Sequence, residues 1–306
     1  MVALAGRVAI VTGGGRGLGR AHCHELARRG AAVVVNDLGV STDGSRTERT
    51  SPASEVVEEI RAFGGTAWAH EGSVTDAADC DRLVAEAVAR FGRLDIVVNN
   101  AGILRSAPLV ETSPADFEAV VAVHLTGTFL LTRAAAVHWA QRRSQGEPVS
   151  GRVINTTSSV GMMGQPEMAA YAAAKAGILG LTLTTAKELA DLGVTCNAVS
   201  PVAATRMTTH LPWNDGAVGD RYSPFDPRNV SPLVAYLASE DASWLTGQVL
   251  RIEGNSVIRM HPWGRGEVYR ASDEGGFVTA DELDRGLRGI YGVFPPAMLS
   301  DATRSA

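Results

Sequence analysis

Residues 8–19 read Val8-Ala9-Ile10-Val11-Thr12-Gly13-Gly14-Gly15-Arg16-Gly17-Leu18-Gly19, and this stretch decides the fold. The apolar run predicts a short buried strand, and a helical pattern follows the glycines to about Arg29. Glycines let the backbone approach a ligand closely, and a helix N-terminus offers free N–H groups to a pyrophosphate. The spacing is Gly-x-x-x-Gly-x-Gly and not the common dinucleotide fingerprint, so a glycine turn without a ligand stays a second interpretation.

A second informative stretch lies between residues 153 and 177. The β-branched run 153–157 predicts a buried strand, Ser158 stands at its end, and an alanine-rich helix follows. Tyr171 and Lys175 are four residues apart and therefore share one helix face. A cation beside a phenol favours the phenolate and lowers its pKa, while a serine hydroxyl can hold a substrate oxygen during proton transfer. The set predicts oxidation of an alcohol or reduction of a ketone, although an ordinary surface helix explains the Tyr–Lys pair taken alone.

The rest of the chain alternates strands with helices. This order predicts one α/β domain, a Rossmann-like doubly wound parallel sheet with helices on both faces. Seven strands are expected, the first and fifth in the two stretches above and the others at Ala32–Asn36, Ala67–Glu71, Leu94–Asn99, Val194–Val199 and Val249–Ile252. Residues 1–255 are the predicted catalytic domain. Residues 256–306, with a helix start at 278–283, are predicted to pack on the core or on a neighbouring subunit.

Taken together, these motifs make the chain resemble the short-chain dehydrogenase/reductase family. The matching residues are Thr12-Gly13-x-x-x-Gly17-x-Gly19, Asn99-Asn100-Ala101-Gly102, Ser158 and Tyr171-x-x-x-Lys175. Thirteen positions separate Ser158 from Tyr171, as in the family. The resemblance covers residues 4 to about 255 and implies that Ser158, Tyr171 and Lys175 are catalytic. It also implies that the dinucleotide is bound by Gly13, Gly15, Arg16, Gly17, Leu18, Gly19, Asp37, Ser73, Val74, Asn100, Ala101, Gly102, Tyr171, Lys175, Pro201, Val202 and Thr205.

The choice between NAD and NADP depends on two residues. Asp37 directly follows the second predicted strand, where an acid can bond the ribose hydroxyls and would repel a 2′-phosphate. In the resembled family a basic residue at the position of Arg16 often accompanies NADP, but the acid usually decides. NAD is therefore the predicted cofactor, with a solvated loop acid as the other interpretation of Asp37.

His124 departs from the commonest family pattern, which has an asparagine at this place. That asparagine is credited with a proton relay that links solvent, the lysine and the tyrosine. A histidine can serve the same relay through a ring nitrogen or its backbone carbonyl. His124 is therefore a fourth candidate catalytic residue, and a core histidine without catalytic duty is the alternative.

Four short stretches of sequence narrow the resemblance to one group within the family. They are residues 34–39, 99–105, 123–125 and 206–208. They are similar to the dehydrogenase part of the peroxisomal multifunctional β-oxidation enzyme and its bacterial relatives. That group includes (3R)-hydroxyacyl-CoA dehydrogenases, some of which also oxidise hydroxysteroids. The resemblance implies a 3-hydroxyacyl-CoA substrate, with a hydroxysteroid as the alternative and a non-catalytic nucleotide-binding regulatory protein as a different class. Residues 207–228 are rich in large apolar groups and predict a lid over a greasy substrate, or an ordinarily packed loop.

Composition excludes several other classes of protein. The chain has 306 residues, 45% of them apolar, and a net charge of −5, so no basic footprint for nucleic acid is predicted. Cys23, Cys80 and Cys196 are odd in number and far apart, which favours buried free thiols. His22 and His24 are two apart on a helix and face different ways, so no metal site is predicted.

The chain also lacks the patterns of membrane insertion and export. No uninterrupted apolar run reaches 18 residues, and the first residues lack the apolar region of a signal peptide. We therefore expect no membrane partner and a cytoplasmic location. The family resemblance implies a homo-oligomer, either a dimer or a tetramer.

Overall fold

The computed structural model describes residues 2–44, 51–208, 223–261, 283 and 287. The chain divides into two compact units, residues 1–260 and residues 261–306. The predicted helix start at 278–283 lies outside the described residues except for Leu283, which is helical. Most of the predicted lid, residues 209–222, also lies outside them.

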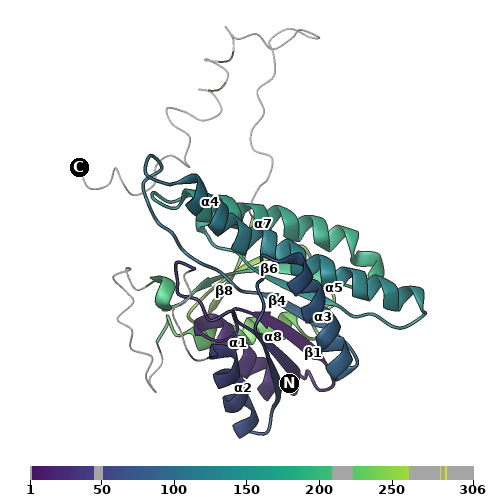
Figure 1. Cartoon of the computed structure of the whole chain (residues 1–306). Helices are drawn as coiled ribbons and strands as arrows, with labels where there is room; N and C mark the ends of the chain where they lie inside the picture. Colours follow the sequence, from purple (N-terminus) through teal and green to yellow (C-terminus); the bar gives the residue numbers. More distant parts are fainter. Residues whose placement is uncertain (1, 45–50, 209–222, 262–282, 284–286, 288–306) are drawn as a thin grey trace, which may run out of the picture. The chain divides into compact units, whose positions relative to one another are not determined.

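One sheet forms the centre of the first unit (Figure 1). Its eight strands follow the order β3-β2-β1-β4-β5-β6-β7-β8, with bounds β1 Val8–Thr12, β2 Ala32–Asn36, β3 Thr66–His70, β4 Ile96–Asn99, β5 Arg152–Thr156, β6 Thr195–Val202, β7 Val249–Glu253 and β8 Ser256–Met260. Neighbouring strands from β3 to β7 are parallel, which confirms the predicted doubly wound fold. The predicted count of seven strands was wrong. A tight turn with Gly254 at φ 55° reverses the chain after β7, and β8 returns antiparallel to it.

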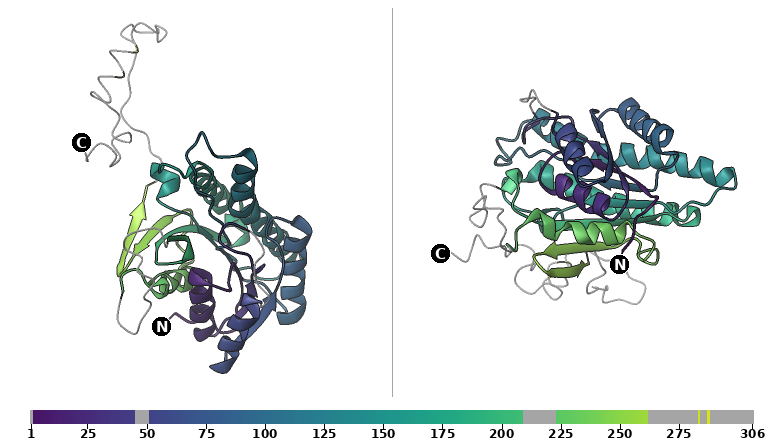
Figure 2. Two further views of the ribbon diagram at one scale, coloured as in Figure 1. Left: turned by 60° about the vertical axis from the view of Figure 1, so that its left-hand side comes forward. Right: turned by 90° about the horizontal axis from the view of Figure 1, so that it is seen from below.

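Helices cover both faces of the sheet (Figure 2). One layer contains α1 Gly17–Arg28, α2 Pro52–Ala62 and α8 Ser231–Leu237, and the other contains α3 Ala77–Phe91, α4 Pro114–Val121, α5 Gly127–Ser144 and α7 Ala169–Glu188. The strands alternate between the two layers. On β1, Ala9 and Val11 pack in the core beneath α1, α2 and α8, while Ile10 packs in the core beneath α3 and α5. Because every β1 residue is buried, the strand is a continuous apolar run in the sequence.

A long helical stretch begins after Ser113, where a serine followed by proline is typical of a helix start. The Ser113 side chain accepts a hydrogen bond from the Asp116 backbone N–H at 3.1 Å, and Pro114 occupies the first helical position. The stretch 114–144 is long and apolar enough to cross a membrane by length and composition alone. Part of this stretch packs inside the fold, since α4 contacts α7 and α5 contacts α3 and β4, with Leu131 and Trp139 fully buried. Phe117, Phe129 and Val137 on the same stretch are exposed.

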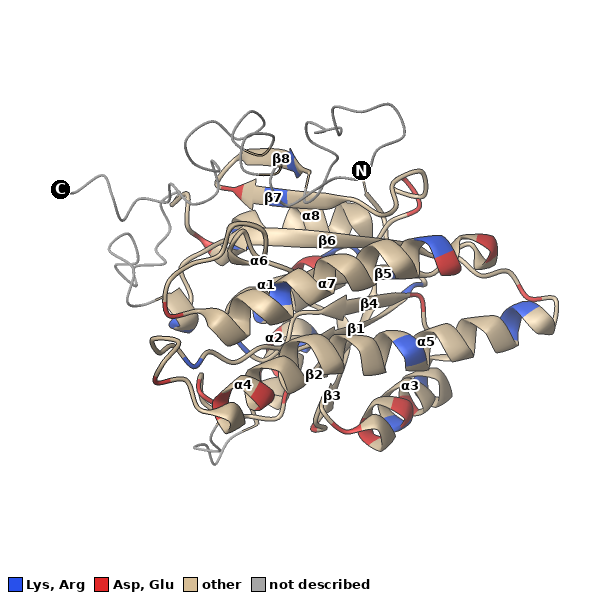
Figure 3. Cartoon of the chain, turned by 90° about the horizontal axis from the view of Figure 1, so that it is seen from above, with Lys and Arg blue, Asp and Glu red and all other residues tan. Residues whose placement is uncertain are grey.

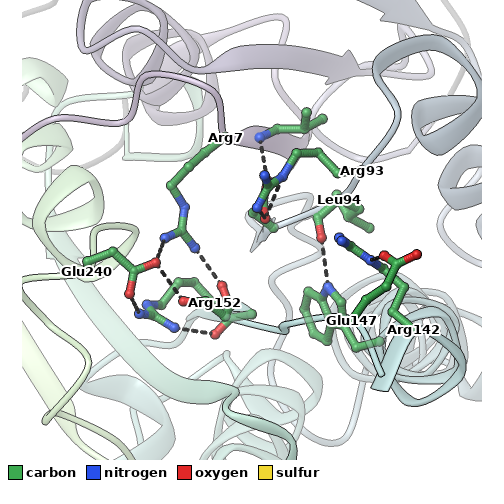
Figure 4. Close-up of polar contacts among 12 residues, drawn as sticks. Arg7, Arg93, Leu94, Arg142, Glu147, Arg152 and Glu240 are labelled. Carbon is green, nitrogen blue, oxygen red and sulfur yellow. Dashed lines mark hydrogen bonds and ion pairs between the residues drawn. The ribbon is translucent and has the colours of Figure 1, made fainter. Parts of the chain in front are cut away.

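Charged side chains join the elements at the amino ends of the strands (Figure 4). Arg7, just before β1, and Arg152, at the start of β5, both pair with the Glu240 carboxylate, Arg152 at 3.1 Å. Arg93 pairs with Asp95, just before β4, at 2.7 Å. Elsewhere on the described elements, basic and acidic residues are interspersed in the view of Figure 3. These ion pairs hold together the segments at the amino edge of the sheet, opposite its carboxyl edge.

Strand order fixes where a ligand binds in such a sheet. The chain runs from β1 outward to β3 and then resumes on the other side of β1 with β4. In open α/β sheets, ligands bind outside the carboxyl ends of the strands at this point of reversal. The carboxyl ends of β1 and β4 therefore mark the place to look for the site.

Candidate active site

Three predicted motifs meet at the carboxyl edge of the sheet. Val98 on β4 pairs in register with Val11 on β1 and with Ile154 on β5, so the three strands end side by side. The glycine turn follows β1, residues 100–102 follow β4, and Ser158 follows β5. Motifs separated by about 150 residues of sequence thereby lie at one edge.

The glycine turn has no room for side chains at four positions, 13, 14, 15 and 19. A Cβ atom on Gly19 would lie 2.0 Å from the Gly13 carbonyl oxygen, and one on Gly15 would lie 2.8 Å from Asp37 Oδ2. Gly17, at φ 50°, opens α1 in the left-handed region that favours glycine. The first N–H groups of α1 have no partner within the helix, which suits the pyrophosphate of a dinucleotide.

Residues 100–102 support this turn, and their contact with the cofactor stays a prediction. The Asn100 side-chain amide donates to the Thr12 and Gly13 carbonyls at 2.9 and 3.1 Å. The Thr12 hydroxyl accepts from the Asn100 and Ala101 backbone N–H groups at 3.0 and 3.1 Å. Gly102 lies against the His124 ring, because a Cβ atom there would be 2.3 Å from its Cε1. The supporting role of the Thr12 hydroxyl was missed, since it depends on the pairing of β1 with β4.

Asp37 lies at the end of β2 beside the glycine turn. Its Oδ2 accepts from the Gly15 backbone N–H at 2.9 Å, and its Oδ1 accepts from the Gly39 N–H at 2.8 Å. These bonds fix the carboxylate where the sequence placed the ribose contact. Arg206 was not among the predicted site residues, yet its pKa is lowered by burial and by the nearby Arg16 charge, with Asp37 opposing. Arg16, Asp37 and Arg206 therefore share one electrostatic neighbourhood.

The remaining predicted cofactor residues occupy several loops. Thr205 lies beside the glycine turn, since a Cβ atom on Gly17 would be 3.6 Å from its Cγ2. Pro201 and Val202 form the last residues of β6. Leu18 packs against the core beneath α1, so its side chain has a structural contact of its own.

Ser73 and Val74 follow β3. The Ser73 hydroxyl lies 2.8 Å from the Thr75 hydroxyl, and its backbone N–H donates to Asp79 Oδ2 at 2.8 Å. Val74 packs against the start of α5, because a Cβ atom on Gly127 would lie 2.9 Å from Val74 Cγ2. Their contact with an adenine ring stays a prediction.

Ser158, Tyr171 and Lys175 come together as predicted. The Ser158 hydroxyl accepts from the Val160 N–H at 3.2 Å and lies near enough to Tyr171 to lower the pKa of that phenol. Lys175 Nζ lies 5.4 Å from the centre of the Tyr171 ring and donates to the Thr156 carbonyl at 2.6 Å. The short helix α6 Val160–Met163 approaches α7 so closely that a Cβ atom on Gly161 would be 2.6 Å from the Lys175 carbonyl carbon.

Burial governs the protonation of this group. It raises the pKa of Tyr171 to about 12, with the Ser158 hydrogen bond opposing, and it lowers the pKa of Lys175 to about 7. Both shifts have one cause, since a low-dielectric site disfavours the charged form of each group. The expectation that the lysine lowers the tyrosine pKa is therefore wrong for the protein without ligand. Formation of the phenolate needs positive charge brought into the site.

His124 lies in a π-helical turn, η1 Ala122–Thr126, between α4 and α5. Its ring is buried, with Nε2 2.7 Å from the Ile103 carbonyl oxygen and its edge facing Tyr171 at a centroid distance of 5.2 Å. Nδ1 is buried and has no hydrogen-bond partner among the described residues. The backbone carbonyl accepts from the Thr128 hydroxyl at 2.6 Å. π-Helical turns are often found at functional sites, and this one brings the ring beside the candidate catalytic tyrosine.

The protonation of His124 follows from its surroundings. Burial and then the Lys175 charge hold its pKa well below the usual value, while the Ile103 contact opposes them. The imidazole is therefore neutral near pH 7. Nε2 lies 2.7 Å from the Ile103 carbonyl oxygen and 3.2 Å from the Ile103 backbone nitrogen, and a neutral ring nitrogen can serve only one of them. We assign the proton to Nε2 on the shorter contact, in which it donates to the carbonyl, and this leaves Nδ1 as a hydrogen-bond acceptor.

The other sequence predictions near the site have simpler outcomes. Cys23, Cys80 and Cys196 are buried free thiols, as predicted. His22 contacts the Ser231 hydroxyl at 2.9 Å, while His24 contacts Glu59 at 2.8 Å, so the two rings do face different ways.

The doubly wound sheet, the glycine turn at its point of reversal and the Ser–Tyr–Lys group define a dinucleotide-dependent oxidoreductase. The chain belongs to the short chain dehydrogenase family, which it matches over residues 7–214. It is accordingly an oxidoreductase that acts on hydroxyl or keto groups, in a family that binds a nicotinamide cofactor. The closely packed turn around Gly15 and Gly19, with a carboxylate fixed beside it, suits such a cofactor.

Several curated proteins are similar to this chain. It is 44% identical over 269 residues to hydroxyacyl-CoA dehydrogenase ChsB1 of Mycobacterium tuberculosis, covering 85% of this chain and 81% of that protein. It is 41% identical over 263 residues to a 3-oxoacyl-(acyl-carrier-protein) reductase of Synechocystis, covering 84% of this chain and all of that protein.

Solved structures agree with these relatives. A short chain dehydrogenase from Mycobacterium avium superposes with a TM-score of 0.84 at 43% identity, covering 95% of this chain and 96% of that one. Peroxisomal multifunctional enzyme type 2 from Drosophila melanogaster superposes with a TM-score of 0.72 at 32% identity. That match covers 94% of this chain but only 46% of the Drosophila chain, so this chain spans less than half of that enzyme.

Proposed function

We propose that this chain is an NAD-dependent dehydrogenase that interconverts a 3-hydroxyacyl-CoA and the corresponding 3-oxoacyl-CoA. The observation that carries the proposal is the grouping of Ser158, Tyr171 and Lys175 at the carboxyl edge of the sheet, beside the glycine turn. The relatives named above support the acyl substrate. One is named hydroxyacyl-CoA dehydrogenase and another 3-oxoacyl-(acyl-carrier-protein) reductase. The similar Drosophila protein is named peroxisomal multifunctional enzyme type 2, the group that the four short stretches of sequence resemble.

Each residue of the group has a distinct task in this reaction. Ser158 holds the substrate oxygen through its hydroxyl, which lies near Tyr171. Tyr171 takes the hydroxyl proton during oxidation and returns it during reduction. Lys175, protonated, stabilises the phenolate and orients the ribose of the cofactor. When bound, the oxidised nicotinamide supplies a hydride acceptor and a positive charge.

NAD is favoured over NADP by the position of Asp37. Its carboxylate is fixed by two backbone N–H groups at the end of β2, where it would meet the adenosine ribose. A 2′-phosphate there would be repelled. Arg16 and Arg206 lie close to the same carboxylate, and their positive charges would attract a 2′-phosphate. The ratio of the affinities for NAD and NADP measures whether repulsion by Asp37 or attraction by the arginines prevails.

The proposal is tested by a substrate screen. The purified chain is mixed with NAD or NADP and with (3R)- and (3S)-3-hydroxyacyl-CoA of short and long chain length, and the absorbance of the reduced cofactor is followed. A panel of hydroxysteroids tests the alternative substrate, and Tyr171→Phe is the control for contaminating activity. We expect NAD reduction with a hydroxyacyl-CoA of one configuration. Activity with hydroxysteroids alone would overturn the assignment of a hydroxyacyl-CoA substrate. Cofactor binding without turnover of any compound would favour the non-catalytic alternative.

We also propose a homo-oligomer, either a dimer or a tetramer, in the cytoplasm. The oligomer follows from the family resemblance, and the location follows from the sequence patterns described above. Sedimentation of the purified chain measures the first, and fractionation of cells that express it measures the second.

A further inference from the structure

A chain of buried polar side chains runs beneath the candidate active site. The Asn99 amide on β4 donates to the Thr132 hydroxyl on α5 at 3.0 Å and to Asn155 Oδ1 on β5 at 2.8 Å. The Asn155 amide in turn donates to the Thr182 hydroxyl on α7 at 2.9 Å. All four residues are buried, and Asn155 and Thr182 are completely inaccessible. We call Asn99, Thr132, Asn155 and Thr182 the amide ladder.

Register and helix periodicity bring the ladder together. Asn99 and Asn155 are directly opposite each other on neighbouring parallel strands, so their side chains leave the sheet on the same face. The Thr182 hydroxyl accepts from Asn155 and donates its own proton to the Ile178 carbonyl at 2.7 Å. Satisfied polar groups in a core favour one arrangement, because any displacement leaves a buried donor or acceptor unpaired.

The ladder is joined to the residues of the site through α7 and β5. Thr182 lies seven residues, or two helical turns, after Lys175 and therefore on the same face of α7. Asn155 directly precedes Thr156, whose carbonyl accepts from Lys175 Nζ at 2.6 Å. The Thr157 hydroxyl also donates to the Lys175 carbonyl at 2.9 Å. Three polar contacts over two turns thus hold α7 on the strand that leads to Ser158.

We propose that Asn155 and Thr182 are positioning residues that fix the place of α7 along β5, and with it the place of Tyr171 and Lys175 relative to Ser158. The helix and the sheet also meet through aliphatic side chains such as Leu179, which packs with Ala198 on β6 and Val249 on β7, and such contacts have little directionality. The effect of these residues on turnover rests on the proposed function. Their effect on the surroundings of Lys175 does not.

The lysine content of the chain allows a direct measurement. Only two lysines occur in the 306 residues, Lys175 and the exposed Lys187, both on α7. Lysine labelled with ¹³C at the ε carbon therefore gives two signals, and Lys187 is an internal reference. The pH titration of the Lys175 signal reports the burial and polar contacts of this side chain without substrate or cofactor. Tyr171 and His124, the titratable groups beside Lys175, are not mutated in any of the variants.

Three variants of α7 separate positioning from simple loss of stability. Thr182→Val keeps the shape but removes the hydroxyl, and Thr182→Ser keeps the hydroxyl. Thr185→Val is the matched control, because Thr185 is also buried on α7, one turn further on, and lies outside the ladder. Thermal midpoints are measured for all three, and Thr182→Cys replaces the valine variant should that variant not fold.

For Thr182→Val we expect the Lys175 midpoint to rise by about half a pH unit or more, since burial is what lowers it and a loosened helix admits water. With the active substrate, kcat should fall about tenfold while KM changes less than about twofold, as expected for misplaced reacting groups. Thr182→Ser and Thr185→Val should retain wild-type values. Equal Lys175 midpoints in Thr182→Val and Thr185→Val would overturn the proposal. A wild-type chain without turnover would overturn the proposed function alone, because the ¹³C titration still decides the positioning role.

Discussion

Replacement of His124 by leucine and by asparagine tests whether the ring takes part in proton transfer. The ring lies edge-on to Tyr171 at a centroid distance of 5.2 Å, and its Nδ1 is a buried acceptor without a partner among the described residues. If a water on Nδ1 or on the His124 carbonyl relays protons between Lys175 and solvent, leucine removes the ring part of that relay. Asparagine retains an amide that can hold a water.

The structure also fixes what the substitutions do to stability. Leucine leaves the buried Ile103 carbonyl, now 2.7 Å from Nε2, without its donor, which costs about 1 to 3 kcal/mol. A loss of that size lowers the thermal midpoint by roughly 2 to 8 °C in a chain of this length. Asparagine keeps a donor on a shorter side chain and should lose less. A histidine without polar contacts could be replaced by leucine at no cost. Because Nε2 contacts Ile103, we expect leucine to destabilise the protein whether His124 relays protons or only fills the core.

Turnover and stability are consequently measured separately. If the relay operates, His124→Leu should lower kcat by about tenfold or more and shift its pH profile, with little change in KM, and His124→Asn should retain most activity. His22→Leu is the matched control. His22 is another buried imidazole, bonded to Ser231 on the far layer of helices, and its pKa is likewise lowered by burial, to about 3. That variant should lose comparable stability and keep its kcat.

One result would refute the reasoning about His124. A leucine variant that is less stable, yet has full kcat and an unchanged pH profile at a temperature where it is folded, eliminates the ring relay. His124 would then be a structural residue that holds the Ile103 backbone.

Three further predictions concern the same site. Tyr171→Phe should keep the fold and NAD binding while turnover falls about a hundredfold or more, and near-normal turnover would contradict its role in proton transfer. Asp37→Ala should weaken the preference for NAD by removing repulsion of the 2′-phosphate, as measured by titration of both dinucleotides; tighter binding of NADP than NAD by the wild type would contradict the assignment. Lys175→Met should change how stability depends on pH. In the folded protein the pKa of Lys175 is about 7, whereas the unfolded lysine keeps its proton to about pH 10.5. Between these pH values the unfolded chain binds more protons than the folded chain. The stability of the wild type therefore increases as the pH rises from 7 toward 10.5. The free energy of unfolding, measured in urea, should rise by about 2 kcal/mol more in the wild type than in the methionine variant between pH 6 and 8.5. If the difference between the two free energies does not change with pH, Lys175 is not neutralised by burial.

The fold and the family were predictable because their signals are local. Strands buried on both faces are continuous apolar runs, and the glycine at 19 is required by its contact with Gly13 in the same turn of seven residues. Ser158, Tyr171 and Lys175 lie within 18 residues, so strand end and helix periodicity alone bring them to one place. The cap at Ser113 is local in the same way.

Other properties depend on contacts between distant segments or on burial, which no short stretch contains. The added strand β8 needed the β7 edge to pair with, and the bond of Asp37 to Gly15 needed β1 beside β2. The partner of His124 is the Ile103 backbone on another segment.

Protonation shows the division between sequence and tertiary structure most directly. The sequence correctly paired a phenol with an ammonium, and from that pair alone the tyrosine pKa should fall. Tertiary packing instead buries Lys175 and partly buries Tyr171, so the pKa of Tyr171 rises and that of Lys175 falls. The sequence therefore determined which groups meet, whereas only the tertiary structure decided their charge, because the energy of a charge depends on the dielectric around it and not on its place in the chain.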